Sequence, residues 1–159
     1  MANTQSLCTS FLGELLSATH NFSSANPAQT ASTANTFKAA LYLASATLNA
    51  STTAYSSTGE VTGTGYTAGG VIVTGATNPT STNASTTAGV GYWTPSASIV
   101  YTTVTLTTAF DTMLLYNSTQ SNKAVSVHTF GSQTITAGTF TLTMPTNSTT
   151  AALIRLSTI

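Results

Sequence analysis

The sequence predicts an all-β protein, a β-sandwich or jelly roll with one short N-terminal helix. Three observations predict this fold class. Short apolar runs alternate with Thr in the C-terminal half, turn-forming residues separate these runs, and only residues 6–18 carry a helical period. The length of 159 residues fits one domain, which we expect to span residues 1–159.

The N-terminal segment, residues 6–18, is expected to form a helix or arm, with Ser6 as its N-cap. Its apolar residues lie at i, i+4, i+5, i+8 and i+9 and make one stripe: Leu7, Phe11, Leu12, Leu15 and Leu16. A helix this short needs a surface to pack on. We expect the stripe to dock on the protein's own sheet, with a partner protein as the alternative.

The middle of the chain is less regular. Polar turn-formers flank the apolar residues 37–46 and favour a strand there. Residues 48–70, rich in Thr, Ser and Gly, are expected to form an extended excursion that Tyr55 and Tyr66 anchor. The low-complexity residues 76–91 predict a long surface loop.

The C-terminal half carries the clearest strand signals. Residues 139–144 alternate strictly, with Phe140, Leu142 and Met144 on one face and Thr on the other. Such alternation is typical of a strand with one buried and one solvated face. Further strands are expected at 71–74, 99–106, 112–116, 124–130, 134–136 and 151–156.

Charge is scarce in this chain, and this excludes several classes of function. Only three Lys or Arg and three Asp or Glu occur, with a net charge of zero, while Thr and Ser fill about a third of the chain. Three isolated basic residues cannot neutralise nucleic-acid phosphates or anionic lipids, so we expect neither nucleic acid nor membrane as a partner. A surface with so little charge favours association, which suits a component of an assembly. The single cysteine, Cys8, is expected to be a buried, inert thiol.

Groups for acid–base chemistry are equally scarce. A Ser-His-Asp triad can be assembled only on paper, from Asp111 and either His20 or His128, and no nucleophile-elbow sequence accompanies it. Glu14 lies in the expected helix and Glu60 in a Gly/Thr loop, so a carboxylate pair is not expected. Two distant histidines give no metal spacing. The sequence therefore predicts no catalytic site, no cofactor and no metal.

A glycine-rich string at residues 63–70 faintly resembles a phosphate loop. It lacks the lysine of that motif, and no helix pattern follows it. We expect these glycines to permit positive φ and close approach of backbone segments.

Several aromatic and apolar side chains are candidates for an interface. Aromatic residues on β proteins serve more often as core or interface anchors than as sugar-stacking platforms. The candidate interface residues, from the N-terminal stripe and the aromatics, are Leu7, Phe11, Leu15, Tyr55, Tyr66, Tyr92 and Trp93.

A series of short motifs gives the chain a resemblance to known proteins. In order they are THNF (19–22), TFKAALY (36–42), ATLNASTTAY (46–55), GEVTGTGYTAGG (59–70), LLYNST (114–119), NKAVSVHTFG (122–131), AGTFTLTMP (137–145) and ALIRL (152–156). The series resembles a family of small structural proteins of tailed bacteriophages. It covers most of the chain outside residues 76–91.

The resemblance implies a virion component without enzymatic activity. Decoration (cement) proteins of phage capsids are commonly small, β-rich and oligomeric, often trimeric. The expected role is therefore a capsid decoration protein on the virion surface that bridges neighbouring major capsid protein subunits, with a homo-oligomer, a trimer among the forms, as the functional unit. Two alternatives stay open: a neck, tail or fibre-associated structural protein, and a carbohydrate-binding module with Tyr55, Tyr66, Tyr92 and Trp93 as its platform.

Overall fold

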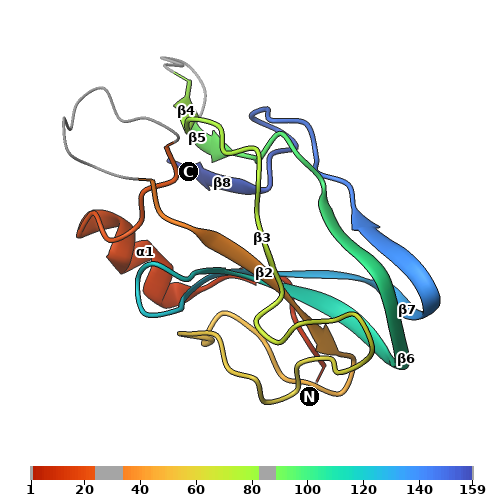
Figure 1. Cartoon of the computed structure of the whole chain (residues 1–159). Coiled ribbons are helices and arrows are strands. Elements are labelled where there is room, and N and C mark those ends of the chain that lie inside the picture. The colour runs from red at the N-terminus through yellow and green to blue at the C-terminus, as the bar shows by residue number, and fades with distance from the viewer. Residues whose placement is uncertain (1, 24–33, 83–88, 159) are drawn as a thin grey trace.

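The computed structural model describes residues 2–23, 34–82 and 89–158. It contains two antiparallel sheets and one helix, α1 (Thr9–Leu16) (Figure 1). The larger sheet has the order β1-β7-β6-β2-β3 and the smaller one β4-β5-β8. The strands are β1 (Ser6–Leu7), β2 (Phe37–Leu43), β3 (Val71–Ile72), β4 (Thr80–Ser81), β5 (Val90–Trp93), β6 (Ile99–Asn117), β7 (Lys123–Leu142) and β8 (Ile154–Ser157). The prediction of an all-β, sandwich-like fold with one short N-terminal helix is confirmed.

The hairpin of β6 and β7 dominates the larger sheet and curves along its length (Figure 1). Register shifts interrupt the pairing at several points between Tyr101 and Tyr116, and two non-glycine residues in these regions, Thr103 and Ala137, have φ values of 53° and 47°. Extra residues of this kind bend a strand without ending it. The sequence pattern predicted several short strands in this region. The structure instead has two long, continuous strands with bulges.

The core has two parts. One cluster lies under α1 and joins the two sheets, through residues such as Phe11, Phe37, Trp93, Leu114 and Ile154. The other lies on β2, the first part of β6 and the last part of β7, and includes Leu41, Tyr101, Leu106, Phe110 and Met113. Burial of these side chains provides the main favourable free energy of folding.

The N-terminal segment differs in part from its prediction. Ser6 and Leu7 pair with Val127 and Ser126 as a strand, and the helix begins only at Thr9. The N-cap is Cys8, which has extended dihedrals and donates its backbone N–H to Val125 O, so the sheet holds this residue outside the helix. The prediction that Ser6 is the N-cap was wrong, because the Ser6 hydroxyl donates a hydrogen bond to the carbonyl of Thr4. Cys8 is buried, as predicted, and burial, with the nearby Glu14 charge, raises its thiol pKa to about 11.

The surface loop predicted at 76–91 is also corrected in part. Residues 80–81 form β4, which pairs with Tyr92 and Gly91 of β5. Thr is β-branched and suits an exposed strand, so a Thr-rich, low-complexity segment can still join a sheet. Residues 83–88 of the predicted loop lie outside the described residues.

The glycine-rich string packs its backbone against the larger sheet. A Cβ on Gly70 would lie 1.7 Å from Ala39 O, and one on Gly63 would lie 2.0 Å from Thr105 O. Side chains cannot fit at these distances, so the glycines serve close backbone approach, as the sequence predicted.

Candidate functional site

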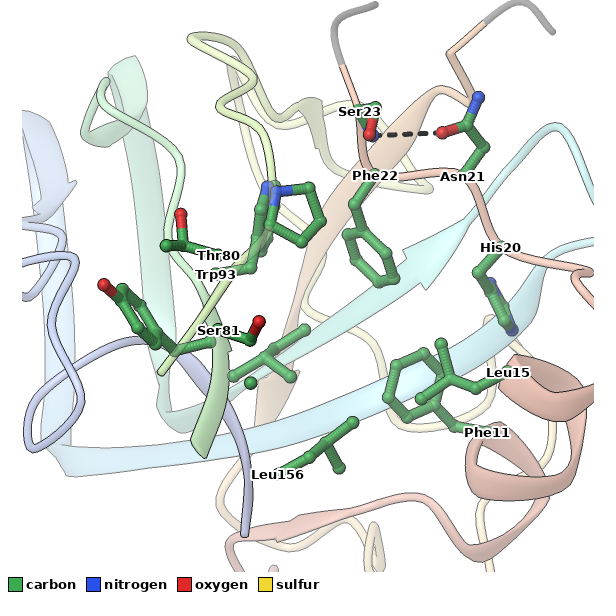
Figure 2. Close-up of a pocket in the computed structure, with 14 residues that line it drawn as sticks. Phe11, Leu15, His20, Asn21, Phe22, Ser23, Thr80, Ser81, Trp93 and Leu156 are labelled. Carbon is green, nitrogen blue, oxygen red and sulfur yellow. Dashed lines mark hydrogen bonds between the residues drawn. The ribbon is translucent and has the colours of Figure 1, made fainter. Parts of the chain in front are cut away.

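An apolar groove lies between α1, residues 20–23 and the smaller sheet (Figure 2). Its volume is about 440 Å³. The residues that line it are Phe11, Leu15, His20, Asn21, Phe22, Ser23, Pro79, Thr80, Ser81, Gly91, Tyr92, Trp93, Ile154 and Leu156. No Asp, Glu, Lys or Arg of the described segments lines this groove, so its chemistry is that of an apolar surface with a few hydroxyl and amide groups.

The structure brings four of the seven candidate interface residues together in this groove: Phe11, Leu15, Tyr92 and Trp93. Figure 2 shows Phe11 and Leu15 on one side of the groove and Trp93 on the other. Leu7 lies in β1, where its partly buried side chain packs on the first core cluster. Tyr55 and Tyr66 lie elsewhere, in a network around a buried carboxylate.

The aromatic wall of the groove is part of the core. Trp93 is only 3% exposed, and its indole N–H donates a 2.9 Å hydrogen bond to Thr77 O. Phe22 packs between Trp93 and Phe37, with its ring stacked on that of Phe37 at a centroid distance of 4.3 Å. The sequence analysis missed Phe22 because a lone aromatic in a polar stretch gives no periodic signal. Trp93 is therefore unavailable as part of an exposed sugar-stacking platform.

The exposed face of α1 lies beside the groove. Phe11 is buried and Leu15 half-buried, whereas Leu12 is 46% and Leu16 93% exposed. Residues one position apart are about 100° apart around a helix, so only part of the stripe can face the core. The stripe thus docks on the protein's own sheet through one edge and leaves two leucines in solvent. We call Leu12 and Leu16, the two exposed leucines of α1, the leucine patch; Leu156, 37% exposed, belongs to the adjoining groove.

A polar network closes the end of the groove at His20. Glu14 accepts from Lys123 Nζ at 2.6 Å and lies 2.8 Å from His20 Nε2. Burial raises the pKa of Glu14, but the hydrogen bonds and charges of Lys123 and His20 outweigh this and hold the pKa below its ordinary value. Two of the chain's few charged groups are therefore used to hold α1 on the β6–β7 turn.

The protonated nitrogen of His20 follows from its neighbours. Asn117 Oδ1 accepts from the backbone N–H groups of Thr119 and Gln120, which fixes the orientation of this amide. Its Nδ2 then faces His20 Nδ1 at 3.0 Å and donates to it. The imidazole therefore carries a proton on Nε2 and donates it to Glu14.

The second polar site is the Glu60 network. Glu60 is 6% exposed and accepts hydrogen bonds from Tyr55 Oη at 2.6 Å, Tyr66 Oη at 2.7 Å and the Gly69 backbone N–H at 2.7 Å. Burial and the hydrogen bond to Glu60 raise the pKa of both tyrosines well above the ordinary value. Tyr55 and Tyr66 thus anchor the 48–70 excursion on the sheet, the role the sequence predicted for them.

The residues considered for catalysis lie in separate surroundings. Asp111 accepts from Asn3 Nδ2 and Thr112 Oγ1. His128 Nε2 lies 2.8 Å from Ser126 Oγ, but Ser126 is buried and burial lowers the pKa of His128 to about 4. Such an imidazole is a poor base at neutral pH. This pair therefore offers no activated nucleophile.

Two further properties concern the described residues alone. No three His, Cys, Asp or Glu side chains among them gather as a metal site would require. No helix in residues 2–23, 34–82 or 89–158 is long and apolar enough to cross a membrane.

Comparisons with known proteins give no match: no protein-family model, no curated protein and no solved structure matches this chain. The resemblance to phage structural proteins stays a hypothesis that rests on the motif series.

Proposed function

We propose that this protein is a non-enzymatic structural protein of a phage virion, a capsid decoration protein that contacts the major capsid protein through the leucine patch and the adjoining groove. One observation carries the choice of surface: Leu16 is 93% exposed on α1, the helix whose Phe11 and Leu15 line the apolar groove. Exposed apolar surface next to a concavity is typical of protein–protein contact sites.

The distribution of charge supports this kind of contact. Glu14 and Lys123 are paired with each other, and Glu60 is buried in its network. Few charges remain to steer a partner, so the contact depends on apolar burial and shape. A single contact of this kind can be modest, because many copies on a regular shell bind through repeated contacts.

A binding experiment with capsids tests this proposal. Capsids of the encoding phage, prepared without this protein, are mixed with the purified chain and sedimented. We expect co-sedimentation of the wild-type protein and a loss of at least about tenfold in affinity for the double variant Leu12→Glu/Leu16→Glu, because burying two unpaired carboxylates is costly. The control Ile72→Glu places one carboxylate at an exposed apolar residue away from α1, 59% exposed on β3.

The control variant should bind like the wild type, and circular dichroism should show all proteins folded. Failure of the wild-type protein to bind, or equal binding by the leucine-patch variant, overturns the proposal. A neck, tail or fibre-base position could use the same surface with fewer copies per particle, so the copy number separates these roles.

A further inference from the structure

The outer edge of β7 is unpaired over most of its length. On one side β7 pairs with β6 from Lys123 to Leu142. On the other side the described residues cover only its start: Thr53 and Ala54 bond to Ala124 and Lys123, Cys8 bonds to Val125, and β1 pairs with Ser126 and Val127. Beyond Thr129, whose hydroxyl is 3.5 Å from Gln5 Oε1, no strand of the described residues pairs with this edge. The distal half of β7 forms the right-hand margin of the molecule in Figure 1.

This edge lacks two of the usual protections against pairing with another chain, charge and proline, and its bulge at Ala137 lies just before residues 138–142. Natural sheet edges carry Lys, Pro, or bulges that twist the edge away. No charged residue occurs between Lys123 and Arg155, and β7 contains no proline. The last register shift lies between Tyr101 and Val104, opposite Phe140 and Gly138, and from there residues 140–142 pair with Ile99–Tyr101 without interruption. The final stretch of β7 is thus a regular, uncharged, open edge.

The side chains of this stretch are complementary to a copy of themselves. Thr139 and Thr141 are exposed on one face, and Phe140 and Leu142 are half-buried on the other. When a strand of period two pairs antiparallel with itself, in a register centred on any one residue, Thr meets Thr and apolar meets apolar. Cross-strand pairs of these types stabilise a sheet.

We propose that the edge of β7 at residues 138–142 pairs antiparallel with the same edge of a second copy of this chain, and so makes a two-fold dimer with a continuous sheet. A second copy fits better than a charged partner, because the chain has no net charge and the edge offers no charge to pair. The pairing is isologous, since each residue contacts the same set on the partner. This inference concerns the free protein and does not rest on the capsid role.

Sedimentation velocity over a range of protein concentrations tests the inference. We expect a monomer–dimer equilibrium for the wild type and a monomer for Thr139→Lys/Thr141→Lys, because like charges would face each other across the new pair. The control Thr62→Lys/Thr67→Lys adds the same charge at exposed threonines of the 48–70 excursion and should still dimerise.

Amide hydrogen exchange gives a second measurement on the unaltered protein, which keeps the test valid if the β7 variant does not fold. The amides of residues 138–142 should exchange more slowly as the protein concentration rises, while those of the 48–70 excursion should not change. A wild-type protein that stays monomeric at millimolar concentration overturns the inference. So does a dimer or trimer that survives the β7 substitutions or leaves exchange at residues 138–142 independent of concentration.

Discussion

The Tyr66 hydroxyl donates a 2.7 Å hydrogen bond to Glu60 Oε1 and fixes a buried carboxylate in a chain that has few charges. The same hydroxyl accepts the Leu41 backbone N–H at 3.0 Å. Tyr66 therefore links the 48–70 excursion directly to β2, and Glu60 is the acceptor around which that link is built.

Glu60→Gln should destabilise the protein by about 1–3 kcal/mol, because an amide cannot accept from Tyr55, Tyr66 and Gly69 at once and a buried donor loses its partner. The free energy of urea unfolding measures the change. Asp111→Asn is the control, since Asp111 is only partly buried and belongs to a separate network. Equal effects of the two substitutions would contradict the assigned role of Glu60.

Gly70→Ala should prevent folding or cost more than about 4 kcal/mol, because the added Cβ would collide with Ala39 O and Gly70 has a φ of 67°. Gly131→Ala has no heavy atom within 4 Å of its Cβ and should change stability by less than about 1 kcal/mol. Thermal unfolding of the two variants provides the comparison. A folded Gly70→Ala protein of normal stability would show that this backbone contact is not as close as described.

His128 should make stability depend on pH in the mildly acidic range. Burial lowers its pKa from 6.5 to about 4, so the unfolded chain binds this proton more readily than the folded one. Above pH 6.5 the neutral His128 therefore leaves the free energy of unfolding at its full value, and this free energy declines as the pH falls toward 4. Urea unfolding between pH 7 and pH 4.5 should show this decline, and His128→Gln should reduce it. An unchanged slope in the variant would rule out His128 as the source.

Glu14 should make the stability of the fold depend on pH in a more acidic range than His128 does. Its pKa is held below the ordinary value of 4.5, so the folded state binds its proton less readily, and its contribution to stability is present above pH 4.5 and lost as the pH falls further. In Glu14→Gln, unfolding below pH 4.5 should depend less steeply on pH than in the wild type. At pH 7 the variant should be less stable, because it loses the ionic contact with Lys123. A wild-type acid slope in the variant would contradict this assignment.

Trp93→Ala should unfold or strongly destabilise the protein, by about 3–5 kcal/mol, because the indole fills the core between the two sheets. Tyr92→Ala, at a half-buried residue of the groove, should stay folded and is the informative variant for glycan binding. Glycan-array binding by the wild type that Tyr92→Ala abolishes would favour the carbohydrate-binding alternative. Absence of glycan binding by the wild type would count against that alternative.

The extent to which sequence predicted the structure varies with the element. Strict alternation at 139–144 predicted part of β7 correctly, because period-two burial is a local property of the chain. The bulges at Thr103 and Ala137 gave no local signal, since they depend on how β6 and β7 pair over a distance. The start of α1 was placed too early because β7 holds Ser6 and Leu7 as a strand, and pairing with a residue 120 or so positions away cannot be seen in a helical period.

The candidate site was predicted only in part for similar reasons. Phe11, Leu15, Tyr92 and Trp93 were selected as aromatic or apolar anchors, but their convergence in one groove depends on how the smaller sheet packs beside α1. The role of Glu60 was missed, because a carboxylate in a Gly/Thr-rich stretch looks solvent-exposed when its tyrosine partners are not known to face it.

The copy number of this protein in the virion tests the central proposal most directly. Quantitative mass spectrometry of purified particles gives the ratio of this chain to the major capsid protein. A decoration protein is expected at a ratio near that of the major capsid protein. A count of about a dozen copies or fewer per particle would contradict the capsid role and favour a neck or tail position, because such structures have one low-order symmetry axis.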